Sequence, residues 1–202
     1  MRYELLSCHG FEEAMLGAML SYGKTSLEDL LAYPLIEPDI INRMFELSKK
    51  LAKAGPGHDK FMEQIQYWIA IQAPLYWWKQ FDTYRIGVSK SSESTMHKSW
   101  KYGLTELMFE NAVYPCTIEY LNRDIHRYHV VEDPEIKKQL EKQIVSNLPD
   151  GYLQTRMVNT NAKTLKNIYN QRKDHKLTEW REFCDWFKTL PCGELITGVE
   201  HG

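Results

Sequence analysis

Apolar side chains recur along the first half of the chain with the two periods that distinguish strands from helices. Short alternating runs predict strands, and longer runs with apolar residues three or four positions apart predict helices. The strands are predicted at residues 3–7 and 64–72, and the helices at residues 11–22, 38–54 and 74–81. The run at 64–72 is apolar on both faces, so we expect a strand that is covered on both sides.

The second half continues with the same mixture of elements. Helices are predicted at residues 119–128, 134–145, 161–172 and from 178 to the Leu190-Pro191 pair, with a strand at 152–158. The Asp133-Pro134 pair is typical of a helix start, whereas the hydroxyl-rich run at 89–99 indicates a loop. Strands that do not alternate strictly with helices predict an α+β (α/β-like) fold.

Length and charge narrow the class of protein. A chain of 202 residues with 43% hydrophobic residues suffices for one domain, and no shift in composition divides it, so we expect a single domain over residues 1–202. The formal net charge of -2 provides no basic surplus for a nucleic-acid polymer or an anionic membrane. No apolar run approaches the length of a membrane span, and the N-terminus lacks a secretion signal, so we expect a cytoplasmic protein.

The four cysteines do not form a recognisable metal-binding or disulfide pattern. Cys8, Cys116, Cys184 and Cys192 are scattered, without a C-x-x-C pair or a histidine at zinc-finger spacing. We expect four reduced structural thiols and no metal site.

Polar donors line one side of the predicted helix at 161–172. Asn161 stands at its start, Lys163 and Asn167 share a face, and Arg172 stands at its end. Amide and cationic donors in this order suit a flavin ring edge, a ribose or a phosphate. A solvated helix face with ordinary capping residues has the same pattern, so these residues alone leave both interpretations open.

The order of residues over a longer stretch favours the ligand-binding interpretation. Residues 159–167 read Asn-Thr-Asn-Ala-Lys-Thr-Leu-Lys-Asn, residues 171–175 read Gln-Arg-Lys-Asp-His, and residues 179–182 read Glu-Trp-Arg-Glu. This stretch resembles the flavin-dependent thymidylate synthases. The resemblance implies that Asn161, Lys163, Asn167 and the His175-Lys176 pair contact the flavin and that Arg172 contacts the nucleotide. Lys163 stands where the family has an arginine, and Lys176 where it has a histidine, with His175 one place earlier.

Two upstream motifs extend the resemblance. Gly57-His58 resembles the family's Gly-His, which makes His58 a candidate flavin contact. The family's Arg-His-Arg signature, followed by Asn-Glu and Ser, aligns with residues 83–97 in two registers. In the first register Thr83-Tyr84-Arg85 takes the place of Arg-His-Arg, which makes Tyr84 a candidate flavin contact.

In the second register Arg85 takes the place of the first arginine, and four later residues complete the motif. Glu93 and Thr95 then join Arg85 as candidate catalytic residues. Arg85, Ser94, Thr95 and His97 are the candidate substrate-binding residues, together with Arg172 of the later segment.

The resemblance implies a central, mostly antiparallel sheet flanked by helices and a flavin-dependent enzyme. Such an enzyme uses FAD, with NADPH and methylenetetrahydrofolate as co-substrates, to methylate deoxyuridine monophosphate, and it assembles as a homotetramer. The aromatic run that includes Tyr67, Trp68, Tyr76, Trp77 and Trp78 suits a subunit interface or a core equally. Two alternatives remain: a catalytically impaired nucleotide- or flavin-binding relative or interaction module with the same fold, and an unrelated α+β protein.

Overall fold

The computed structural model describes residues 1–33, 38–95, 100, 102–110 and 112–199. The chain divides into two compact units. The first unit contains residues 1–4, 70–84 and 90–157, and the second contains residues 5–69, 85–89 and 158–202. Each unit is described by itself below. No helix in the described part of the chain has both the length and the apolarity needed to cross a membrane.

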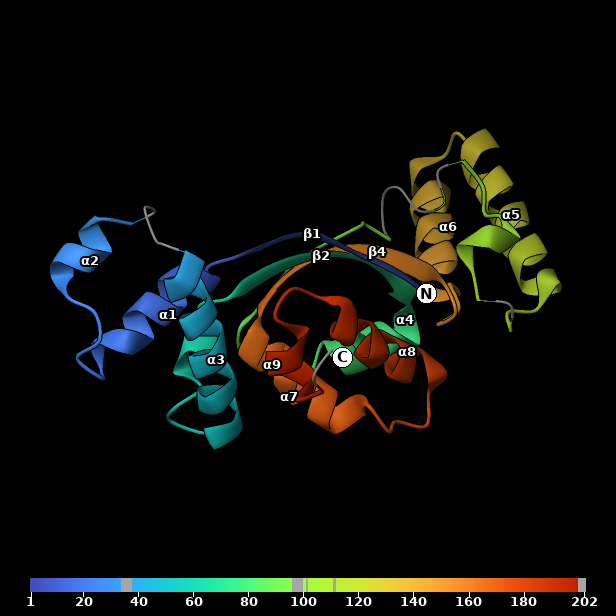
Figure 1. The fold of residues 1–202 in the computed structure, drawn as a ribbon. Coiled ribbons are helices and arrows are strands. Elements are labelled where there is room, and N and C mark those ends of the chain that lie inside the picture. Colours follow the sequence, from blue (N-terminus) through green and yellow to red (C-terminus); the bar gives the residue numbers. More distant parts are fainter. Residues whose placement is uncertain (34–37, 96–99, 101, 111, 200–202) are drawn as a thin grey trace. The chain divides into compact units, whose positions relative to one another are not determined.

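Four strands form the central sheet (Figure 1). They are β1 (Arg2–His9), β2 (Gln66–Pro74), β3 (Val88–Ser92) and β4 (Leu153–Asn161). Their order in the sheet is β1-β2-β4-β3, and the pairing is antiparallel. This arrangement, with helices flanking the sheet, confirms the predicted fold class.

Two predictions about strands were wrong. β2 is not covered on both faces, because Tyr67, Ile69 and Ile71 are fully buried while Trp68 is 45% exposed. The run at 89–99 is not a loop throughout, because β3 occupies Val88–Ser92. Apolar periodicity could not reveal β3, since its exposed, hydroxyl-rich residues are held by backbone pairing with β4 rather than by a buried face.

The second unit is mainly helical. Its helices are α1 (Phe11–Leu20), α2 (Leu27–Leu31), α3 (Pro38–Ala54), α7 (Ala162–Arg172), α8 (Thr178–Trp186) and α9 (Gly193–Thr197), with short 3-10 helices η1 (Lys60–Glu63) and η3 (Phe187–Thr189). α7 lies against α8, α9 and η1. Trp180, Phe183 and Phe187 are fully buried and pack edge to face, which anchors the C-terminal helices.

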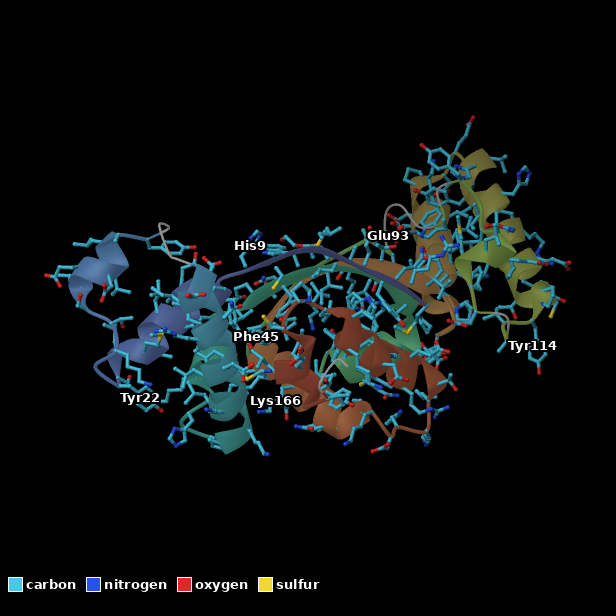
Figure 2. The ribbon with its side chains drawn as sticks, viewed as in Figure 1. His9, Tyr22, Phe45, Glu93, Tyr114 and Lys166 are labelled. Atoms are coloured by element: carbon cyan, nitrogen blue, oxygen red, sulfur yellow. The ribbon has the colours of Figure 1, made fainter. Side chains whose placement is uncertain are left out.

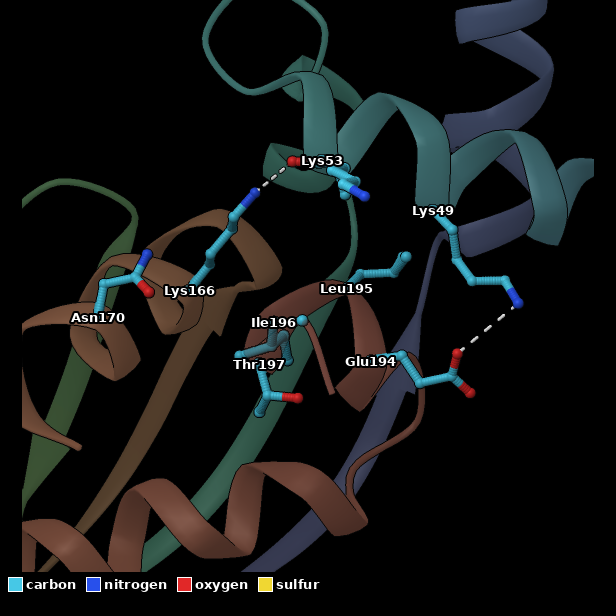
Figure 3. A pocket seen from close by; sticks show the side chains of 10 residues that line it. Lys49, Lys53, Lys166, Asn170, Glu194, Leu195, Ile196 and Thr197 are labelled. Atoms are coloured by element: carbon cyan, nitrogen blue, oxygen red, sulfur yellow. Dashed lines mark hydrogen bonds and ion pairs between the residues drawn. The ribbon is translucent and has the colours of Figure 1, made fainter. Parts of the chain in front are cut away.

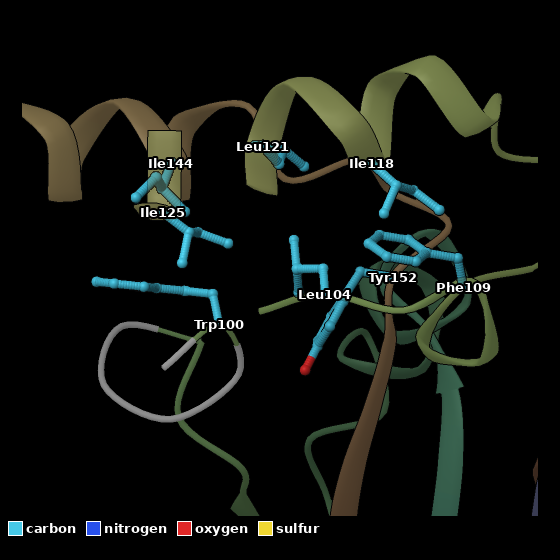
Figure 4. Close-up of a cluster of buried hydrophobic side chains, with 8 residues drawn as sticks. All are labelled: Trp100, Leu104, Phe109, Ile118, Leu121, Ile125, Ile144 and Tyr152. Atoms are coloured by element: carbon cyan, nitrogen blue, oxygen red, sulfur yellow. The ribbon is translucent and has the colours of Figure 1, made fainter. Parts of the chain in front are cut away.

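The first unit contains α4 (Leu75–Phe81), α5 (Pro115–Val130), α6 (Pro134–Ser146) and the 3-10 helix η2 (Glu106–Met108). α5 begins at Pro115 rather than at residue 119, because a proline at the first helical position needs no hydrogen-bond partner for its nitrogen. α5 and α6 pack against each other over a cluster of buried side chains (Figure 4). The cluster consists of Trp100, Leu104, Phe109, Ile118, Leu121, Ile125, Ile144 and Tyr152.

Most of the aromatic run proposed as an interface is core. Tyr67, Trp77 and Trp78 are fully buried, and Tyr76 is half-buried. Trp68 is the member of the run that presents a large exposed ring. An aromatic-rich sequence does not indicate by itself which rings face outward, because packing within the chain decides it.

Candidate functional site

Asn161 joins the end of β4 to the start of α7. Its side-chain oxygen accepts a hydrogen bond from the Thr164 backbone N–H at 2.9 Å, so Asn161 is the N-cap of α7. The Thr164 hydroxyl donates to the Ile86 carbonyl at 3.1 Å, which holds residues 86–87 against this helix end. A Cβ on Gly87 (φ +70°) would lie 2.5 Å from the amide nitrogen of Asn161. The Asn161 side chain is therefore covered by backbone and is buried.

Lys163 is held by two carboxylates of the segment that contains η1. Its ammonium group lies 2.7 Å from Glu63 and 3.4 Å from Asp59, and Asp59 is 6% exposed. The hydrogen bond to Glu63 is the main cause of a raised pKa for Lys163, so the lysine remains charged at neutral pH. The two carboxylates offset part of the attraction that Lys163 offers to a phosphate.

His58 and Asn167 are both exposed. His58 lies in the turn closed by its own N–H to the Gly55 carbonyl, directly before Asp59. The Asn167 side-chain oxygen accepts a hydrogen bond from Gln171 at 3.0 Å, one turn further along α7. Through Asp59 and Lys163, the His58 turn is fixed against the same helix that presents Asn167.

Arg172 and His175 lie at the end of α7. The Arg172 guanidinium lies over the buried Trp180 ring, with its central carbon 4.9 Å from the ring centre, in a cation–π contact. Burial, followed by the positive charges of Arg172, Lys176 and Arg181, lowers the pKa of His175. The His175 Nδ1 accepts a hydrogen bond from the Leu177 N–H at 3.1 Å. His175 is therefore neutral near pH 7 with its proton on Nε2, while Lys176 is exposed.

Glu93 in the first unit continues the pairing between β3 and β4 (Figure 2). Its backbone N–H donates to the Thr155 carbonyl at 2.9 Å, and its carboxylate accepts from the Thr155 N–H at 3.3 Å. The Gln154 amide donates to the Glu93 carbonyl at 2.8 Å. Ser94 and Thr95 follow and are half-buried.

The remaining predicted site residues are distributed over both units. Tyr84, in the first unit, is 7% exposed and packs edge to face against Phe81 at 6.1 Å, which leaves little ring surface for a ligand. Arg85 is exposed and belongs to the second unit, whereas Glu93 and Thr95 belong to the first. His97 lies outside the described residues.

A charged network in the first unit escaped the sequence analysis. The Asp82 carboxylate accepts hydrogen bonds from Lys90 at 2.6 Å and from Arg156 at 2.8 Å. Arg156 also donates to the Gln154 side chain at 2.9 Å and stacks over Trp78 at 4.2 Å. Burial raises the pKa of Asp82, but the hydrogen bonds from the two cations outweigh it and the pKa is lowered. No sequence signal pairs Asp82 with Arg156, because the two residues lie far apart in the chain.

The cysteines differ more in burial than the sequence suggested. All four are free thiols, but Cys184 is buried, Cys8 and Cys192 are half-buried, and Cys116 is exposed. Burial raises the pKa of Cys184 and of Cys192 to about 12, which makes both thiols unreactive at neutral pH. Cys116 is exposed, unlike the other three thiols, which fit the expected structural role better.

Two crystal structures of the flavin-dependent thymidylate synthase ThyX from Helicobacter pylori, each with FAD and dUMP, superpose on the chain with TM-scores of 0.70 and 0.67. The first is 15% identical and covers 98% of this chain and 97% of its own; the second is 14% identical and covers 98% and 96%.

Comparison at the level of sequence gives no match: no protein-family profile and no curated protein corresponds to the chain. At 14 and 15% identity, the likeness to the ThyX structures establishes the fold.

Proposed function

We propose that the chain is a divergent flavin-dependent thymidylate synthase, which transfers a one-carbon unit to deoxyuridine monophosphate or a related pyrimidine nucleotide. The observation that carries the proposal is the likeness, over 98% of the chain, to ThyX structures that hold FAD and dUMP. FAD is the proposed cofactor, with NADPH and methylenetetrahydrofolate as co-substrates. The proposal extends to one functional domain over residues 1–202 and a cytoplasmic location.

The donors presented by the second unit fit a flavin nucleotide in their chemistry. His58, Asn167 and Lys176 are exposed and offer an imidazole, an amide and an ammonium group, and Lys163 adds a second cation. When bound, the flavin supplies the hydride chemistry of the reaction. The side chains of this chain orient the cofactor by hydrogen bonds to its ring edge and phosphates. Asn161 caps α7 and is covered by the backbone at Gly87, so it acts by positioning α7 rather than by touching the ligand.

The nucleotide-binding role falls to Arg172 and to residues 85–95. The cation–π contact with Trp180 restrains the Arg172 guanidinium, whose planar fork suits two parallel hydrogen bonds to a phosphate. Arg85 is the cation proposed to polarise the pyrimidine ring. Glu93, Ser94 and Thr95 are proposed to contact the nucleotide, with Glu93 and Thr95 next to the reacting atoms.

A homotetramer completes the proposal. A single copy of the chain leaves Trp68 on β2 45% exposed, and a large aromatic ring on a sheet is favoured at subunit interfaces. A Trp68→Ser variant is expected to shift the protein toward smaller assemblies in sedimentation velocity. A wild-type protein that sediments as a single subunit at micromolar concentration would contradict the tetramer.

The enzyme proposal is tested by spectroscopy followed by turnover. The purified protein, reconstituted with FAD, is expected to show a flavin absorbance spectrum that persists through gel filtration. After reduction with NADPH, addition of deoxyuridine monophosphate and methylenetetrahydrofolate is expected to oxidise the flavin and to yield thymidylate, detected by mass spectrometry. A protein that takes up no flavin and whose melting temperature does not respond to deoxyuridine monophosphate would refute it.

Replacement of Arg172 tests the nucleotide site by itself. Arg172→Ala is expected to weaken deoxyuridine monophosphate binding by about tenfold to a hundredfold, the effect of losing one charge-assisted pair. Arg172→Lys separates charge from geometry, and Lys173→Ala, one residue further along and exposed, is the control. Equal nucleotide affinity in the wild type and Arg172→Ala would remove Arg172 from the site.

A binding protein without turnover is the second candidate. It is favoured by the two carboxylates on Lys163 and by the presence of a single arginine, Arg85, in residues 83–95. This candidate predicts flavin and nucleotide binding of the same strength but no thymidylate. The turnover experiment above separates the two candidates directly.

A further inference from the structure

A cleft in the second unit lies outside all the residues assigned above. It has a volume of about 380 Å³ and lies among α3, α7 and α9 (Figure 3). Lys53, near the C-terminal end of α3, and Lys166 and Asn170 of α7 line it. Lys166 and Asn170 are four positions apart, so they project from the same side of the helix.

The walls of the cleft carry an excess of positive charge. Of the described residues that line the cleft, three are lysines, Lys49, Lys53 and Lys166, and one carries a carboxylate, Glu194. Lys49 pairs with Glu46 at 2.7 Å and lies 3.9 Å from Glu194, so its positive charge is balanced by carboxylates. The C-terminal end of α3 contributes a negative charge of roughly half a unit. Lys53 and Lys166 together exceed it, so the cleft favours an anion.

The two cationic groups are placed at the same end of α3. The Lys166 ammonium donates to the Ala52 carbonyl at 2.6 Å, next to Lys53 (Figure 3). That bond fixes the Lys166 side chain and leaves two of its three N–H groups for a ligand. Lys53 is exposed, so its ammonium group can turn toward the same ligand.

The floor of the cleft is apolar. Ala52, Leu195 and Ile196 line it and are 5%, 2% and 1% exposed. These side chains are already covered by the fold, so they close the cleft from below and add little apolar surface for a ligand.

We propose that this cleft binds a small phosphate anion, either free or as the phosphate group of a monoester. The phosphate accepts hydrogen bonds from Lys53 and Lys166. The Asn170 amide offers a further hydrogen bond. The proposal does not depend on flavin or on thymidylate synthesis, because no residue of the proposed active site lines this cleft.

The test follows the methyl signal of Ile196 during titration with phenyl phosphate and, in parallel, inorganic phosphate. The protein carries ¹³C-methyl isoleucine, and the Ile196→Val variant assigns the signal. Either phosphate is expected to shift this signal in a saturable way, and the ratio of the two affinities shows whether the site prefers a free phosphate or an ester. Because the signal is local, phosphate bound at another site does not affect the readout.

Removing a lysine and removing the carboxylate are expected to change the affinity for phenyl phosphate in opposite directions. Lys53→Gln and Lys166→Gln are each expected to weaken phenyl phosphate binding by about tenfold, since each removes a charge-assisted hydrogen bond. Glu194→Gln is expected to tighten binding several-fold, because it removes the opposing carboxylate. Lys50→Gln, on an exposed position of α3 that does not line the cleft, is the control.

Two results would overturn the proposal. The first is an Ile196 signal that responds to neither phosphate at millimolar concentration. The second is an equal loss of affinity in Lys50→Gln and Lys53→Gln, which would indicate unspecific attraction. Lys53 is exposed, so its variant keeps the test valid if Lys166→Gln unfolds.

Discussion

The role of Asn161 can be resolved by two substitutions that separate capping from ligand binding. Serine caps a helix as well as asparagine does but has no amide group. Alanine cannot cap the helix and has no amide group either. We expect Asn161→Ser to keep both stability and flavin affinity, and Asn161→Ala to lose stability. This expectation follows from the structure, in which the Asn161 oxygen is bonded to the Thr164 N–H and its amide nitrogen faces Gly87.

The magnitude for Asn161→Ala comes from one hydrogen bond at the start of α7. Loss of an N-cap costs about 0.5–2 kcal/mol. Because the Thr164 N–H that loses its partner is part-buried, we expect the upper part of this range, about 1–2 kcal/mol. For a chain of this size, that corresponds to a decrease in melting temperature of about 2–8 °C. Asn161→Ser should stay within about 0.5 kcal/mol of the wild type, since the hydroxyl accepts the same bond.

Urea denaturation followed by tryptophan fluorescence measures the stability of both variants, and titration with FAD measures the affinity. Equal stability of Asn161→Ala and the wild type would refute the capping role. A tenfold loss of flavin affinity in Asn161→Ser at unchanged stability would refute the positioning role. The amide would then contact the flavin, as the resemblance to flavin-dependent thymidylate synthases implies.

Three further predictions concern the surroundings of the proposed sites. Gly87→Ala is expected to destabilise the protein by about 1–3 kcal/mol in urea denaturation, because its φ of +70° is strained for alanine and its Cβ would meet Asn161; unchanged stability would contradict the close approach. Arg156→Met is expected to lower the free energy of unfolding by about 2 kcal/mol, whereas Lys79→Met, which breaks an exposed ion pair, should cost less than about 1 kcal/mol; equal losses would contradict the network. Burial raises the pKa of Asp82, but hydrogen bonds from its cationic neighbours lower it overall. The contribution of Asp82 to stability is therefore present above the ordinary carboxyl pKa of 3.8 and is lost as the pH falls through the lower pKa of the folded state. Asp82→Asn should flatten the profile of stability against pH below pH 3.8, and a profile identical to that of the wild type would refute this role.

Several helices could be predicted from the sequence because the features that indicate them, a capping residue and the spacing of apolar side chains, lie within or next to the helix itself. α3 and α6 occupy Pro38–Ala54 and Pro134–Ser146, where a proline start and apolar spacing predicted helices. The Asp133 carboxylate accepts hydrogen bonds from two N–H groups of the first turn of α6, which is the bond that its residue type and position predicted. α7, with its inward Leu165 and Ile168, also lies where its period placed it.

The candidate site depended on partners that lie far apart in the chain. The sequence presented Lys163 as a free cation, but the fold pairs it with carboxylates 100 and 104 positions earlier, at Glu63 and Asp59. It presented Trp68 as one ring of a covered strand, but the sheet leaves that ring exposed while the rings around it are buried. Burial and charge pairing are properties of the folded chain, so periodicity could not supply them.

What the sequence determined by itself is the longer helices, three of the four strands, the fold class, and the segment at 159–182 whose order of residues resembles that of the flavin-dependent thymidylate synthases. Tertiary structure decided which of the candidate site residues remain available to a ligand. It made Asn161 a cap and Tyr84 part of the core, and it left His58 and Asn167 exposed. The physical reason is that residue type fixes what a side chain can donate or accept, whereas only packing fixes whether that group is already used.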